Sequence, residues 1–98
     1  MIFHIAQRAD FDKVATTGFY TVESLILEGF IHCSLKSQVY PTGGRYFVGK
    51  RDLLLLTIDP EKLIAPLRYE EATNHELFPH IYGTINADAI INYEKIYF

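Results

Sequence analysis

The sequence has 98 residues, of which 49% are hydrophobic and 21% are charged, and its formal net charge is −3. A chain of this length can bury a core of its own, and this composition excludes intrinsic disorder as its main state. The negative charge excludes the strong overall basicity of a dedicated nucleic-acid binder, although a small phosphate-bearing ligand remains compatible with it.

Helices are expected in the first part of the chain. Residues 3–6 are apolar and β-prone and predict a first strand, whereas residues 10–15 predict a helix that stops at Gly18. A second helix is expected to have Thr21 as its N-cap, to carry an apolar side and to end at Gly29.

The middle of the chain predicts a strand and two short helical pieces. Residues 30–34 are β-prone, and the two-residue period places His32 and Ser34 on one face of that strand. Residues 35–40 have a helical pattern, which Pro41 and the glycine pair after it are expected to break, leaving a second short helical piece over residues 45–47.

Strands dominate the rest of the sequence. Residues 52–59 are apolar on both faces and predict a central strand. Further strands are expected at residues 66–70, 81–85 and 89–98. Helices early and strands late indicate an α+β fold, and the absence of linkers and repeats indicates a single domain over residues 1–98.

Cys33 is the only cysteine in the sequence. This excludes an internal disulfide and a multi-cysteine metal site, and it indicates a reducing compartment. On the alternating pattern Cys33 faces away from His32 and is interpreted as a packing residue. The sequence shows no signal-peptide pattern and no aliphatic run long enough to span a bilayer, so we expect a cytoplasmic protein without membrane association.

Two segments carry most of the candidate chemistry. His32 and Ser34 would present an imidazole and a hydroxyl side by side, and both groups can bind a phosphate or sugar oxygen. Around residue 80, a proline fixes the approach to a strand on which His80 and Tyr82 would share a face. The alternatives are a half-buried histidine that only satisfies a carbonyl, and an aromatic hairpin packed into the core.

Three further points bear on the site. Glu70 and Glu71 would face opposite sides of a strand, so only one of them can face a pocket. His4 is either a satisfied core residue or the polar group that a buried strand directs at a pocket. The glycine-rich loops of Rossmann domains and P-loop proteins are missing, which argues against both classes.

Across nearly its full length the chain resembles the bacterial domain-of-unknown-function family number 952. The resemblance rests on the His4-Ile5 start, the run from Glu28 to Ser34, residues 52–60 and 68–70, and the run from Leu77 to Gly83. The chain departs from the family pattern at residues 41–44, which puts Arg45 and Tyr46 in doubt as site residues.

That family is distantly similar to the ADP-ribosyltransferase fold, and within it to the catalytic half of RNA 2′-phosphotransferases. The resemblance implies two small, mainly antiparallel sheets with N-terminal helices, and a cleft between the sheets that binds NAD. It further implies that His4 contacts the adenosine ribose, that His32 and Ser34 line the nicotinamide-ribose side, and that Glu70 or His80 lies near the scissile bond. A helix N-terminus or a backbone nest would then hold the pyrophosphate.

The leading hypothesis is an ADP-ribosyltransferase-like protein that takes NAD as substrate, needs no metal, and transfers ADP-ribose to an unidentified acceptor. Catalytic roles are predicted for His32, Glu70 and His80, and ligand-binding roles are predicted for three further residues, His4, Ser34 and Tyr82. One alternative is a nucleotide or phospho-metabolite binding module without chemistry, which Glu70→Gln would leave untouched. Another is a metal-dependent hydrolase that uses His4, His32, His80 and Glu70 as ligands.

Overall fold

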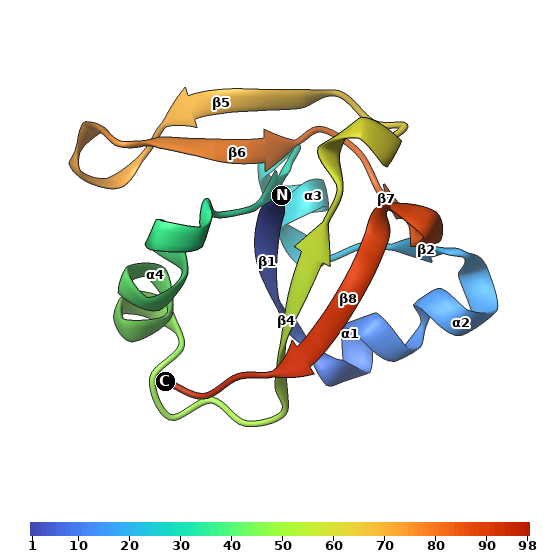
Figure 1. The fold of residues 1–98 in the computed structure, drawn as a ribbon, viewed down its shortest axis with the longest axis horizontal. Coiled ribbons are helices and arrows are strands. Elements are labelled where there is room, and N and C mark those ends of the chain that lie inside the picture. Colours follow the sequence, from blue (N-terminus) through green and yellow to red (C-terminus); the bar gives the residue numbers. More distant parts are fainter.

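A computed structural model describes residues 1–98, with the exception of the side chain of Thr73. The fold is α+β, as expected, and its strands form three small antiparallel sheets in the orders β1-β4-β8, β2-β7 and β3-β6-β5. Figure 1 shows β5 and β6 lying across one end of the first sheet, with α4 on one side of that sheet and α1 and α2 toward the other.

The first sheet is built around the most apolar strand of the sequence. β4 (Leu53–Ile58) pairs with β1 (Ile2–Gln7) on one side and with β8 (Ile90–Lys95) on the other. The buried side chains of β4 belong to the core, which confirms the prediction of a central strand. In this register His4 lies opposite Leu56, so β1 carries one imidazole into an otherwise apolar layer.

The structure has three sheets, whereas two were expected. β2 (Phe19–Tyr20) pairs with β7 (Ile85–Asn86), separately from the sheet of β3 (Ile31–His32), β6 (Leu77–Ile81) and β5 (Leu67–Glu71). The physical reason lies in two glycines with positive φ, Gly18 and Gly83, which redirect the chain just before β2 and β7.

The strand predicted at residues 81–85 begins earlier than expected and ends at Ile81. This strand, β6, is the central strand of its sheet although it contains Pro79. A proline is unusual there because it lacks an N–H group. Its carbonyl accepts a bond from the amide of Cys33, just beyond the end of β3. The N–H and C=O groups of one residue point to the same side of a strand, so the missing donor faces a place where β3 has already stopped.

The helices do not form an N-terminal block. They follow β1 and alternate with β2 and β3, because short strands return the chain to the sheets between them. Their bounds are α1 (Arg8–Asp12), α2 (Val14–Thr17), α3 (Glu23–Glu28) and α4 (Val39–Tyr46). Gly18 and Gly29 take the left-handed conformation at the ends of α2 and α3, as predicted, whereas the N-cap of α3 is Val22 and not Thr21.

The break expected at Pro41 and the glycine pair is absent, because α4 runs through them. Pro41 is the third residue of α4, where backbone N–H groups have no partner within the helix. At Gly43 an added Cβ would lie 1.9 Å from the Phe98 ring, so this glycine leaves room for the C-terminal segment. The other helical elements are single 3₁₀ turns, at Lys36–Gln38, Pro60–Lys62, Thr73–His75 and Ala87–Ala89.

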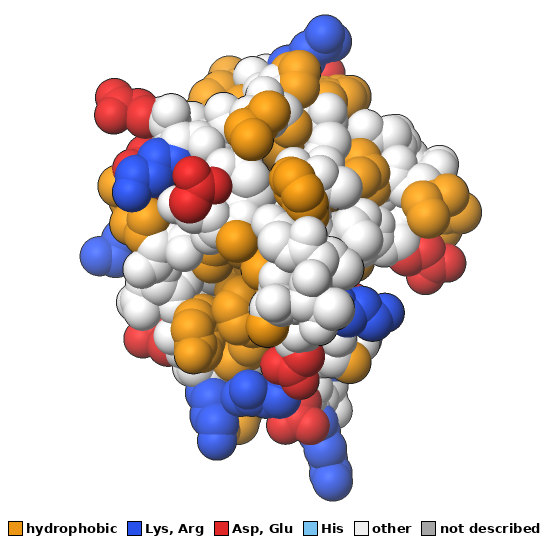
Figure 2. Space-filling model, turned by 90° about the vertical axis from the view of Figure 1, so that its right-hand side faces the viewer, with side chains coloured by type: hydrophobic (Ala, Val, Ile, Leu, Met, Phe, Trp, Pro, Cys, Tyr) orange, Lys and Arg blue, Asp and Glu red, His pale blue; other side chains and the backbone are white. Residues whose placement is uncertain are grey.

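The core is apolar and shared by the three sheets, and the surface mixes hydrophobic and charged side chains. The main core cluster combines buried side chains from all three sheets, among them Tyr20, Ile31, Leu56, Ile81 and Ile85. Figure 2 shows one face, where hydrophobic side chains lie among basic and acidic ones. Within the described residues, no helix has both the length and the apolar character needed to cross a membrane.

Candidate functional site

A cavity of about 440 Å³ opens where the first and third sheets approach each other. Its walls are formed mainly by side chains from β1, β2, β3, β6 and α4, so segments far apart in the sequence contribute to it. The two sheets are joined beside it by a pair of backbone hydrogen bonds between Phe3 and Ser34, of 2.8 and 2.7 Å. The size is within the range of small-ligand sites.

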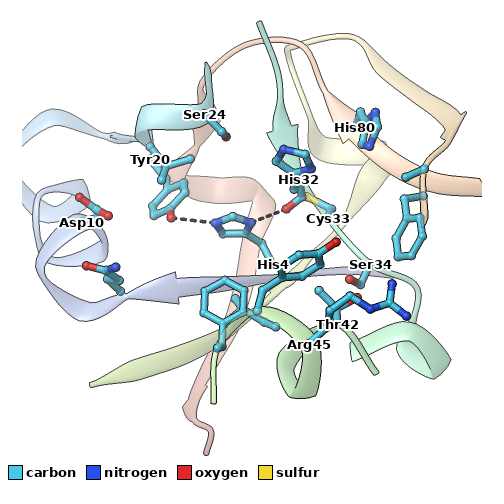
Figure 3. A pocket seen from close by; sticks show the side chains of 17 residues that line it. His4, Asp10, Tyr20, Ser24, His32, Cys33, Ser34, Thr42, Arg45 and His80 are labelled. Atoms are coloured by element: carbon cyan, nitrogen blue, oxygen red, sulfur yellow. Dashed lines mark hydrogen bonds between the residues drawn. The ribbon is translucent and has the colours of Figure 1, made fainter. Parts of the chain in front are cut away.

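His4 lies at the centre of this cavity with both ring nitrogens engaged (Figure 3). Nδ1 lies 2.5 Å from the carbonyl oxygen of His32, which can only accept, so Nδ1 carries the proton. Nε2 is then an acceptor, and the hydroxyl of Tyr20, 2.8 Å away, donates to it. The tautomer of His4 and the direction of the Tyr20 hydroxyl are therefore both determined by the protein.

Burial keeps this pair neutral. It lowers the pKa of His4 to about 4 and raises the pKa of Tyr20 above its usual range. Both nitrogens of His4 are occupied, and Tyr20 is fully buried with one lone pair of its oxygen not used by His4. The structure thus places His4 in the cavity, where it holds Tyr20 in position.

A second network lies on β5 and β6. Nδ1 of His80 is 2.8 Å from Oε1 of Glu70, and the hydroxyl of Tyr82 donates to the same oxygen. These two hydrogen bonds, the one from Tyr82 first, lower the pKa of Glu70, while the bond to Glu70 raises the pKa of Tyr82. Glu70 is therefore ionised at neutral pH and accepts the Nδ1 proton of His80.

His80 and His32 are paired directly across β6 and β3, and both line the cavity. The His80 side chain is only 5% exposed, whereas that of His32 is 52% exposed and its Nε2 lies 2.9 Å from a carboxylate oxygen of Glu28. Cys33 also borders the cavity, although the alternating pattern placed it on the other face, because β3 ends at His32. Burial raises the pKa of its thiol, which argues against a nucleophilic role.

The predicted residues come together in two groups. His4, His32, Ser34 and His80 line the cavity, while Glu70 and Tyr82 are not part of its wall and reach it through His80. Their catalytic and binding roles stay predictions. Within the described part of the chain, no three His, Cys, Asp or Glu side chains converge as metal ligands, and this geometry does not favour the hydrolase alternative.

Sequence reasoning missed several polar side chains of the cavity. Tyr20 was not singled out, and Arg45 was set aside because the helix before it was expected to be broken. In the continuous helix α4, Thr42 and Arg45 lie three residues apart and both border the cavity. That spacing was the available signal. Figure 3 shows Asp10 and Arg45 on opposite sides of His4.

Comparison with known proteins identifies a family and a set of solved relatives. The profile of the family described as "Protein of unknown function (DUF952)" matches residues 5–93. A crystal structure of protein CC0527 from Caulobacter crescentus is 28% identical to this chain, covers 95% of it and 82% of CC0527, and gives a TM-score of 0.87. The solution structure of CC0527 is also 28% identical over 95% of this chain and 81% of CC0527, with a TM-score of 0.80. No curated protein sequence matches the chain.

Proposed function

The chain belongs to the DUF952 family, and from its cavity we propose that it binds NAD or another ADP-ribose derivative and transfers the ADP-ribosyl group to an acceptor. The observation that carries the proposal is the cavity between two sheets, with the Tyr20–His4 pair inside it, Arg45 on one side, and His32 and His80 together in the wall. The resemblance to the ADP-ribosyltransferase fold supplies the class of ligand.

Arg45 is suited to a phosphate group. It borders the cavity, and among the described side chains no carboxylate forms an ion pair with it. A guanidinium can bind phosphate oxygens through two parallel hydrogen bonds, which fixes the orientation of the ligand. Thr42 and Ser34 add hydroxyl groups to the same cavity. This set would act beside the helix terminus or backbone nest that the sequence suggested for the pyrophosphate.

The Tyr20–His4 pair is suited to a sugar or a carboxamide. The Tyr20 proton is committed to His4, so a ligand that displaces the groups covering the buried Tyr20 oxygen would meet an acceptor there, which suits a donor such as a ribose hydroxyl or an amide N–H. Neutrality of His4 also matters for transfer, because the departure of nicotinamide leaves positive charge on the ribose. A protonated His4 in the cavity would oppose that charge, and burial prevents protonation at neutral pH.

The decisive experiment is a calorimetric titration of NAD into the wild-type protein and into Arg45→Gln and His32→Ala. Loss of a charge-assisted phosphate contact is worth about 1.5–3 kcal/mol, so Arg45→Gln should weaken binding by roughly 10- to 100-fold. The matched controls are Arg51→Gln and His75→Ala, at exposed residues that do not line the cavity.

Three outcomes separate the hypotheses. NAD binding that is weakened only in the two cavity variants supports the proposed site. Absence of NAD binding by a wild-type protein that is folded by circular dichroism would contradict the proposal. Tight binding without release of nicotinamide, unchanged by Glu70→Gln, would favour the binding module without chemistry.

A further inference from the structure

The His80 imidazole has one nitrogen in use and one without a partner. Its Nδ1 donates to the ionised carboxylate of Glu70, so its Nε2 holds a lone pair when the ring is neutral. This Nε2 is buried and has no hydrogen-bond partner, and it is the one such side-chain atom among the residues whose side chains are described. An unsatisfied buried acceptor costs about 1–3 kcal/mol, so its presence requires an explanation.

The ring cannot easily turn to relieve this cost. The Phe30 ring stacks on it with centroids 4.0 Å apart and an interplanar angle of 19°. Tyr82 donates its hydroxyl hydrogen to the same oxygen of Glu70 that His80 contacts, and the Arg68 guanidinium lies 5.0 Å from the centre of the Tyr82 ring. A carboxylate that fixes one nitrogen of a buried imidazole while the other nitrogen stays free is the arrangement of a general base.

We propose that Nε2 of His80 is the general base of this protein and takes the proton of an acceptor hydroxyl, with Glu70 and Tyr82 as positioning residues. The inference rests on the proposed function and specifies its acceptor as a group with an O–H bond, of which water is the smallest. The acceptor oxygen bonds to C1′ of the ribose, the bond from C1′ to the nicotinamide nitrogen breaks, nicotinamide leaves as a neutral molecule, and the acceptor proton goes to Nε2.

The surroundings of Nε2 indicate how the acceptor reaches it. The atom is enclosed, and the neighbouring rings of Phe30 and His32 are both partly exposed. The His80 ring itself borders the cavity, so a ligand bound there approaches this residue directly.

The test is NAD hydrolysis, with water as acceptor, in His80→Gln and Glu70→Gln. General-base catalysis contributes typically 100- to 10,000-fold, so nicotinamide release should fall by about 100-fold or more in both variants, while the Kd for NAD changes by less than about threefold. The pH–rate profile should lose its acidic limb in His80→Gln, which a structural role would not produce. Glu71→Gln is the matched control, because this neighbouring exposed carboxylate lies on the same strand but makes no contact with His80.

A second measurement does not depend on turnover. Nitrogen-15 NMR of labelled histidine in wild-type protein, at a pH where the His80 ring is neutral, should find it protonated at Nδ1 and bare at Nε2. A proton on Nε2 under these conditions would overturn the proposal. The proposal would also be overturned if His80→Gln bound NAD and released nicotinamide at the wild-type rate. The proposed function would stand in that case. If the wild-type protein binds NAD but releases no nicotinamide, the base proposal fails while the NAD site stands; if it binds no NAD, the proposed function itself fails.

Discussion

Burial lowers the pKa of His4 to about 4, against 6.5 for an unperturbed histidine. The unfolded chain therefore binds a proton on this residue at a higher pH than the folded protein does, and the free energy of unfolding decreases as the pH falls through this interval. Between pH 7 and pH 4.5 the expected loss from His4 alone is about 2 kcal/mol.

Urea unfolding of wild-type protein and His4→Gln at these two pH values measures this contribution. The decline should be smaller by that amount in the variant, and His75→Gln, which alters a largely exposed histidine, should behave like wild type. An equal decline in wild type and His4→Gln would assign the acid sensitivity to carboxylates, such as Glu70, that lose native hydrogen bonds when they are protonated.

At the scale of single residues, the sequence identified the groups whose chemistry is unusual for their setting. An imidazole in an apolar strand drew attention to His4, and a histidine after a proline drew attention to His80; both line the cavity. Tyr20 could not be identified in this way, because a buried tyrosine is an ordinary core residue. Its importance comes from the bond to His4, which links positions 16 residues apart.

At the scale of elements, Gly43 and Phe98 form a testable pair. Alanine favours a helix over glycine by about 1 kcal/mol, but a Cβ at position 43 would meet the Phe98 ring. We expect Gly43→Ala to destabilise the protein in the wild-type background and to stabilise it by up to about 1 kcal/mol in Phe98→Ala. Thermal unfolding of the four proteins in this cycle provides the measurement, and equal effects in both backgrounds would mean that the ring does not restrict position 43.

The same pair explains why the course of α4 was predicted wrongly. Local propensity treats a proline and two glycines as breaks, whereas the contact of Gly43 with Phe98 is tertiary and leaves no mark on the neighbouring sequence. Similarly, β2 and β7 are distant in the sequence and each is only two residues long. A strand of two residues is too short to show an alternating pattern. The apolar strand β4 was predicted correctly because its signal is contained in its own residues.

At the scale of the whole molecule, the Phe3–Ser34 bridge joins the first and third sheets beside the cavity. If the sheets stay joined in the native state, the amides of these two residues should exchange with solvent only through global unfolding. The amide of Phe19, at the start of the short strand β2, donates to the exposed Thr17 hydroxyl and should exchange faster, through local opening. Hydrogen-exchange NMR tests this, and rapid exchange at Phe3 and Ser34 would mean that the cavity opens by separation of the sheets.

The register of the first sheet also constrains how the protein is made. β1 pairs with β4, and β4 pairs with β8 near the other end of the chain. The first strand therefore leaves the ribosome long before its partner β4 exists, and this sheet cannot be complete until β8 has been synthesised. Folds that depend on such distant pairings cross a large entropic barrier and fold slowly, on the order of milliseconds to seconds. During that delay the apolar residues of β4 are exposed, and these are the residues on which a nascent-chain chaperone would act.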